Sequence, residues 1–343
     1  MPEWVESIIR VAIAIGFVLT TVLVLIWLER KVIGHIQQRL GPMRTGFHGF
    51  LQSPADAVKL LVKEDIIPAA ADRWAFQLAP ALVFVPIFLT VVSIPFTRTL
   101  VVRNLDLGLF YVFAISSISI VGIVMAGWAS GNKYALLGSV RAGAQMVSYE
   151  IPLVFSILGV AMVAGSLNLE TIVDAQRGLW YIVLQPVGMF IFLVASLAEL
   201  NRTPFDIPVA ESEVVGGPYV EYSGIRWGVF FLSEYANTFI ISALAAVVFL
   251  AGWRGPLLPG WLWFLIKTYA IILIIFWFRA TLPRLRIDQL MTFAWKLLLP
   301  LAFVNLLITG LYLVYDWPRW ILFVASVAVL AVASRLVYVV GRA

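Results

Sequence analysis

The sequence predicts an all-α polytopic membrane protein with about nine transmembrane helices. Of its 343 residues, 62% are hydrophobic and 13% are charged, and the mean hydropathy is +0.97. Soluble chains average about 45–50% apolar and about 25% charged residues. Because a spanning helix needs about 20 apolar residues, this chain has room for many, and the composition excludes a water-soluble globular protein.

Nine apolar segments match that length. They occupy residues 8–28, 75–96, 108–128, 143–165, 180–198, 226–251, 261–279, 297–316 and 320–340. The first segment follows Glu3 and Glu6 and lacks the basic start and small-residue cleavage site of a signal peptide. We therefore expect it to remain in the mature protein.

The basic residues predict the orientation of the chain. Lys and Arg collect on the cytoplasmic side of membrane proteins, and an outside N-terminus places 15 of the 24 basic residues in inner loops. We therefore expect an outside N-terminus and a cytoplasmic C-terminus. The same bias explains the net charge of +5 without a nucleic-acid partner. The absence of a targeting sequence favours a bacterial cell (inner) membrane over an organelle.

Residues 1–343 are expected to form a single transmembrane domain with large inner-side connections. These connections are residues 29–74, 129–142, 199–225 and 280–296. Within the first, residues 50–63 place apolar side chains on one helical stripe and polar ones opposite, which predicts an amphipathic helix lying in the membrane interface. A docking helix for a soluble partner is an alternative, and the two interpretations are compatible.

The connection after the fifth apolar segment has unusual charge. Residues 203–225 contain Asp206, Glu211, Glu213 and Glu221 but no Lys or Arg. Clustered carboxylates raise one another's pKa, which would prepare some of them to exchange protons near neutral pH. A solvated acidic loop without such a role is the alternative.

Two carboxylates fall inside apolar segments. Glu150 and Glu234 each lie about eight residues into their segments, roughly 12 Å along a helix. A charge at this depth is costly and is a candidate functional group, although a neutral glutamic acid could serve helix packing alone. Glu199 and Arg202 share a helical face by spacing, which suits an ion pair or proton transfer equally well.

The sequence argues against a redox centre in this chain. It has no Cys and only two histidines, His35 and His48, which removes disulfides, iron–sulfur ligation and zinc thiolates. No phosphate-binding loop, dinucleotide fingerprint or Ser/His/Asp arrangement is present. We expect no metal, flavin or nucleotide site. The basic group Arg279, Arg284 and Arg286 serves positive-inside anchoring in the default interpretation. The alternatives are contact with lipid phosphates, with a soluble partner or with the acidic loop.

Four motif blocks resemble one family from about residue 20 to 300. They are Glu29–Gly34 with Gln38–Pro42 and Leu51–Asp56, Gly127–Tyr134 with Ala144–Glu150, Ala198–Asp206 continuing to Glu221–Ser223, and Arg279–Met291. These blocks are similar to the H subunit family of proton-pumping NADH:quinone oxidoreductase, respiratory complex I.

The resemblance implies a membrane subunit that forms the quinone chamber beneath a soluble arm. Ubiquinone or menaquinone would be the substrate, held without a covalent bond, while NADH, flavin and iron–sulfur clusters would belong to other subunits. Partners would be that quinone-reducing arm, neighbouring membrane subunits and lipids. By this resemblance, the acidic residues that match the family's proton-coupling positions are Glu150, Glu199, Glu211, Glu213, Glu221 and Glu234. The residues that the resemblance places near the quinone chamber are Glu29, Arg30, Asp56, Phe205, Asp206 and Arg279.

The mechanism this implies is electrostatic. Quinone reduction would create transient negative charge, and the carboxylates would respond by shifting protons along the membrane arm. Two alternatives stay open from the sequence. One is the membrane anchor of a related energy-converting hydrogenase or of a ferredoxin- or deazaflavin-linked complex. The other is a stand-alone cation/proton antiporter, which predicts a strong inverted repeat that this sequence lacks.

Overall fold

The chain folds into a bundle of helices. A computed structural model describes residues 3–340, with side-chain environments for residues 4–335, and these described residues contain no strand. The long helices are α1 (Glu3–Ile36), α3 (Arg73–Thr90), α5 (Ile118–Ala129), α6 (Lys133–Ala164), α9 (Pro186–Glu199), α11 (Gly224–Phe249), α12 (Gly260–Thr281), α14 (Leu299–Val314) and α15 (Arg319–Val340). The shorter ones are α2 (Gln52–Val62), α4 (Gly108–Ser116), α7 (Leu169–Ala175), α8 (Tyr181–Leu184), α10 (Glu211–Val214) and α13 (Ile287–Phe293). Single turns lie at Phe47–Gly49, Val91–Ser93 and Gly217–Tyr219, and a π-helical turn at Ala294–Leu298 joins α13 to α14.

Seven helical stretches of the described residues are long and apolar enough to cross a membrane. They are Trp4–Ile36, Arg73–Ser93, Gly108–Ala129, Lys133–Ala164, Gly224–Phe249, Gly260–Thr281 and Ile287–Val314. The predicted all-α polytopic class is confirmed. The fifth expected segment corresponds to the shorter apolar helix α9 of 14 residues, and the ninth to α15, whose last side chains lie outside the described residues.

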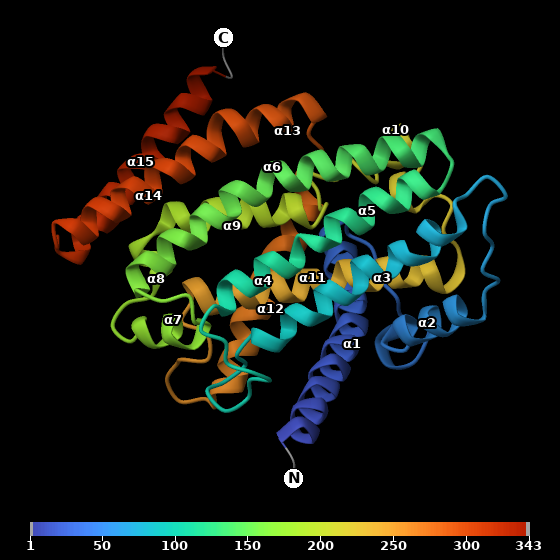
Figure 1. Cartoon of the computed structure of the whole chain (residues 1–343), viewed down its shortest axis with the longest axis horizontal. Coiled ribbons are helices and arrows are strands. Elements are labelled where there is room, and N and C mark those ends of the chain that lie inside the picture. The colour runs from blue at the N-terminus through green and yellow to red at the C-terminus, as the bar shows by residue number, and fades with distance from the viewer. Residues whose placement is uncertain (1–2, 341–343) are drawn as a thin grey trace.

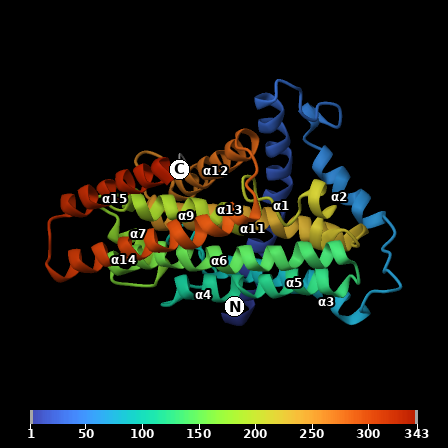
Figure 2. The same cartoon turned by 90° about the horizontal axis from the view of Figure 1, so that it is seen from above.

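Most of the bundle runs along the long axis of the molecule. Figure 1 shows α3, α5, α6, α9 and α11 side by side in that direction, while α1 crosses them steeply in both views (Figure 1 and Figure 2). The helices α2 and α10 and the turn between α5 and α6 gather at one end of the bundle. The helices α7 and α8 lie at the other end.

Helix α11 forms the centre of the bundle. It packs against α1, α3 and α12, and every residue from Tyr235 to Phe249 is buried. Burial on all sides means that this helix contacts protein rather than lipid along its second half. Glu234 directly precedes this fully buried stretch.

Several expected boundaries are wrong. Helix α1 continues to Ile36, so residues 29–36 belong to a helix and not to a loop. Helix α6 begins at Lys133, so most of the expected connection 129–142 is helical. The Asn132 side chain caps this early start by accepting from the Tyr134 amide at 2.9 Å, which satisfies one of the free donors of a helix N-terminus. Hydropathy alone does not detect a helix that projects beyond the apolar zone.

The expected amphipathic helix is present as α2. It packs against α1 and α11, while Val58 and Leu61 on its other side are exposed. An exposed apolar side next to membrane-spanning helices is typical of a helix in the membrane interface, so this geometry agrees with the predicted character of residues 50–63.

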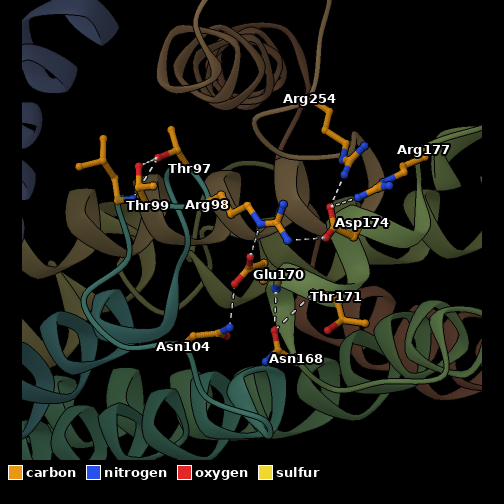
Figure 3. Close-up of polar contacts among 11 residues, drawn as sticks. Thr97, Arg98, Thr99, Asn104, Asn168, Glu170, Thr171, Asp174, Arg177 and Arg254 are labelled. Atoms are coloured by element: carbon orange, nitrogen blue, oxygen red, sulfur yellow. Dashed lines mark hydrogen bonds and ion pairs between the residues drawn. The ribbon is translucent and has the colours of Figure 1, made fainter.

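A network of ion pairs lies at the end of the bundle that carries α7. Figure 3 shows Arg98 reaching both Glu170 and Asp174, with Arg177 and Arg254 also directed at Asp174. Burial raises the pKa of Asp174, but the hydrogen bond and charge of Arg254, with the other two arginines, outweigh it and leave this pKa below its ordinary value. This network joins α7 to the loops at 97–104 and 250–260.

Candidate functional site

A charged cavity of about 960 Å³ opens at the end of the bundle that carries α10. The segment after α9, the first half of α11 and the end of α12 form its wall. Its charged lining residues are Arg202, Asp206, Glu211, Glu234, Arg279 and Arg284, and its aromatic lining residues are Tyr219, Tyr222, Trp227, Phe230 and Phe231. This combination of aromatic walls and convergent charges suits a flat, partly apolar ligand with a polar head.

Arg202 is the centre of a buried charge network at the base of the cavity. Its side chain is 2% exposed, and its Nη1 lies 3.1 Å from Glu29 Oε1 while its Nε lies 3.1 Å from Glu234 Oε1. Arg279 contacts the same Glu29 carboxylate, and the Tyr235 ring covers the Arg202 guanidinium at 4.6 Å. Buried charges persist only when they are paired and hydrogen-bonded. The network therefore fixes α1, α11 and α12 around one point.

The chain reaches this geometry through a sharp turn after α9. Asn201 adopts a left-handed backbone with φ 49°, a conformation that Asn tolerates better than most residues. The Arg202 amide then returns to the Leu197 carbonyl at 3.1 Å. The turn directs Arg202 away from Glu199, so the ion pair considered for these two residues is wrong. Spacing of three applies only inside a helix, and α9 ends at Glu199.

Asp206 lies in the cavity wall and pairs with Arg284, whose Nη2 is 3.0 Å from Asp206 Oδ2. Burial raises the pKa of Asp206, against the opposing effect of the Arg284 charge. A raised pKa makes a carboxyl easier to protonate. Of the contacts considered for the basic group after α12, the structure shows the one with the acidic loop, made by Arg284.

Glu150 and Glu199 form a second acidic site inside the bundle. The Ser117 hydroxyl lies 2.6 Å from Glu150 Oε1, and the two carboxyls interact electrostatically. The Glu199 Oε2 atom is buried and has no partner among the described side chains. A void of about 20 Å³ beside Glu199, lined also by Thr90, Ser116 and Asn237, has room for about one water molecule.

The remaining acidic residues of the loop lie in different places, one in the cavity lining and two in contact with α6 and its cap. Glu211 lines the cavity, whereas Glu213 pairs with Arg141 at 2.7 Å and Glu221 accepts from Asn132 at 2.6 Å. The last two thus connect the loop to α6 and to its cap. All four acids of residues 203–225 have a defined place in the fold.

The other chamber residues fall into two groups. Glu29 and Arg279 belong to the network around Arg202, while Arg30 and Asp56 pair with each other at 2.7 Å between α1 and α2 and lie outside the cavity lining. Phe205 is buried 5.3 Å from the Tyr149 ring. It is not among the residues that line the cavity, and it supports the loop through its ring and through its amide, which donates to the Arg202 carbonyl at 2.8 Å.

Sequence reasoning missed the part that Arg202 and the aromatic wall play. Arg202 pairs with residues that are far from it in sequence, which no local spacing reveals. Aromatic residues near the ends of apolar segments resemble membrane-interface anchors, and Trp227 fits that pattern as well as it fits a cavity wall. The available signal was the density of aromatic residues between Tyr219 and Phe231 beside the acidic loop.

Within the described residues, no group of three or more His, Asp or Glu side chains could hold a metal ion. Two carboxylates of the cavity pair with arginines, Asp206 with Arg284 and Glu234 with Arg202.

These features define a polytopic helical membrane protein with a charged interior cavity. The profile of the family described as NADH dehydrogenase matches residues 9–310. The chain is 52% identical to the H subunit of the NADH-quinone oxidoreductase of Dehalococcoides mccartyi (strain CBDB1) over 307 residues, 90% of this chain and 87% of the relative. It is 50% identical to the H subunit of Anoxybacillus flavithermus over 319 residues, covering 90% and 96%. It is 50% identical to the H subunit of Geobacillus kaustophilus over 325 residues, covering 90% and 98%. The chain therefore belongs to the NADH dehydrogenase family.

Proposed function

We propose that this chain is the H subunit of an NADH-quinone oxidoreductase, and that its cavity is the membrane part of the quinone chamber. Identity near 50% to proteins of that name over about 90% of the chain supports the first statement. The observation that carries the second is the cavity of about 960 Å³, whose wall combines aromatic residues with Asp206, Glu234 and Arg279. Ubiquinone or menaquinone has the flat headgroup and apolar tail that such a wall suits.

The reaction is divided between this chain and its partners. NADH oxidation and the electron carriers belong to a soluble arm that docks on the end of the bundle carrying α2 and α10. Residues 29–74, 129–142, 199–225 and 280–296 form the docking and chamber surface, and neighbouring membrane subunits and lipids cover the sides. The chain spans a bacterial inner membrane with an outside N-terminus and a cytoplasmic C-terminus.

Coupling to proton movement proceeds through the carboxylates. Negative charge that forms on the quinone during reduction acts on Glu234 through Arg202, because the ion pair at 3.1 Å shares one buried guanidinium with Glu29. The response then reaches Glu199 and Glu150. Electrostatic interaction between these last two groups makes the protonation of one depend on the other.

Photolabelling tests the position of the quinone. A short-chain quinone carrying a photoreactive group, applied to the purified complex with NADH withheld, should label residues 201–234. Val220→Trp fills the cavity from its wall and should raise the KM for that quinone about tenfold, because occluding binding contacts weakens ground-state binding. Val332→Trp, on the exposed side of α15, is the matched control. Labelling confined to other segments, together with an unchanged KM for V220W, would contradict the proposal.

A further inference from the structure

Gln145 joins α6 to both ends of the turn that follows α9. Its side chain is buried, with 2% of the residue exposed. Its Nε2 lies 2.8 Å from the Ala198 carbonyl oxygen, 2.8 Å from the Phe205 carbonyl oxygen and 3.1 Å from Asn201 Oδ1. These acceptors are the neighbours, in sequence, of Glu199, Asp206 and Arg202.

One amide thus serves three acceptors. A Gln side chain has two N–H donors, so three acceptors share two hydrogens. The Ala198 carbonyl is among the last of α9 and also accepts from the Asn201 amide at 3.2 Å, so Gln145 adds a side-chain donor to the backbone cap of this helix end. Gln145 therefore caps α9 and holds the start of the acidic loop with the same group.

The position of Gln145 on α6 links the turn after α9 to Glu150. Glu150 lies on the same helix, little more than one turn further on. Tyr149, also on α6, donates its hydroxyl to the Leu290 carbonyl at 2.8 Å and lies against the Phe205 ring. Helix α6 thus holds the segment 198–205 with hydrogen bonds from Gln145 and supports it with the ring of Tyr149.

We propose that Gln145 is the positioning residue that holds the turn 198–205, and with it Glu199, Arg202 and Asp206, in fixed register with Glu150 on α6. A movement of the acidic loop during quinone reduction then changes the position of Glu150, because the Gln145 amide connects the loop to α6. The inference rests on the proposed function, since it assigns Gln145 a part in the same coupling.

Gln145→Met tests the proposal in the complete complex. Met has a similar length and no donor, so the Ala198 and Phe205 carbonyls lose the bond from the Gln145 amide while the packing volume is kept. We expect kcat for a short-chain quinone to fall about tenfold, within the range that residues along a coupled path show. The number of protons moved per electron should fall as well. The KM should stay within about twofold, since Gln145 does not line the cavity.

Gln176→Met is the matched control. Gln176 is equally buried, at 1% exposure, and its Nε2 also donates to backbone carbonyls, those of Val247 and Val248 at 3.0 and 3.1 Å. It lies on the segment after α7, at the opposite end of the bundle. Loss of its contacts lowers stability as loss of a buried hydrogen bond does, but should leave the ratio of protons to electrons unchanged.

Asn201→Gly provides a gentler second variant. Gly tolerates the positive φ of this position and removes one of the three acceptors. Because Asn201 also lines the cavity, its effect is measured at saturating quinone, where kcat and the proton ratio should fall about twofold to threefold. This variant decides the question if Gln145→Met prevents assembly. A wild-type kcat and proton ratio in both variants, or in N201G when Q145M does not assemble, would overturn the role of Gln145. If the wild-type complex itself reduces no quinone with NADH, the proposed function fails first.

Discussion

Glu29 in α1 and Arg202 after α9 form a buried ion pair across 173 positions of sequence, with Arg202 Nη1 at 3.1 and 3.3 Å from the two carboxylate oxygens. Both side chains are less than 5% exposed. Because the same guanidinium also binds Glu234, this pair connects the tilted N-terminal helix to the wall of the cavity. The same ion pair therefore holds the helices together and forms the base of the candidate site.

Removing this arginine should destabilise the protein strongly. Arg202→Met leaves the Glu29 and Glu234 carboxylates without their shared partner, and breaking a buried pair costs about 3–5 kcal/mol. Thermal unfolding of the purified complex measures the effect. Arg98→Met is the control, because Arg98 is 68% exposed and exposed pairs contribute at most about 1 kcal/mol. Equal losses in the two variants would contradict a special role for Arg202.

Glu234→Gln should impair quinone reduction while leaving the complex assembled. The amide keeps the size of the side chain and removes the charge that faces both the cavity and Arg202. We expect kcat/KM for a short-chain quinone to fall about tenfold, which corresponds to a loss of about 1.4 kcal/mol of transition-state stabilisation. Glu170→Gln removes a carboxylate at the opposite end (Figure 3) and should not change it. A wild-type kcat/KM for E234Q would remove Glu234 from the mechanism.

Glu150→Gln and Glu199→Gln should lower proton movement per electron, and the double variant should be no worse than either single one. Two groups that interact act as a unit, so their effects do not add. Proton uptake by vesicles that contain the complex, measured with the rate of NADH oxidation, gives the ratio. Independent effects that sum in the double variant would show that the two carboxylates serve separate paths.

Acid should loosen the end of the bundle at α7. The folded-state pKa of Asp174 lies below its ordinary value of 3.8 because of Arg254, Arg177 and Arg98. A lowered pKa contributes stability that is present above about pH 4 and is lost as the pH falls through the folded-state pKa. Hydrogen exchange at the α7 amides should therefore accelerate on acidification, and Asp174→Asn should remove the dependence. Constant protection of these amides down to about pH 3 would show that the network contributes no stability there.

Local patterns predicted the helices and failed at their ends. The apolar stretches placed α3, α11 and α12 within a few residues, because hydropathy measures the zone that contacts lipid. It missed that α6 begins at Lys133, since Lys133, Ser139 and Arg141 lower the mean hydropathy of its first turns and a cap at Asn132 sets the start.

Contacts between distant segments were not predictable from spacing. The acids of residues 203–225 were identified from composition, and the structure places Asp206 and Glu211 in the cavity lining. The ion-pair partners in the cavity were not identified from the sequence, because Glu29, Arg202 and Glu234 lie on three elements that meet only after folding. The Glu199–Arg202 ion pair, one of the two alternatives for these residues, is absent for a local reason, the left-handed turn at Asn201.

The most direct test is to recover the tagged chain from gently solubilised membranes and to assay the assembly for NADH-driven reduction of a short-chain quinone. The account predicts a large complex with that activity, and a loss of activity in E234Q without loss of subunits. A large complex driven only by hydrogen or ferredoxin would contradict NADH as the electron source. A lone chain that exchanges protons without quinone would contradict the quinone chamber itself.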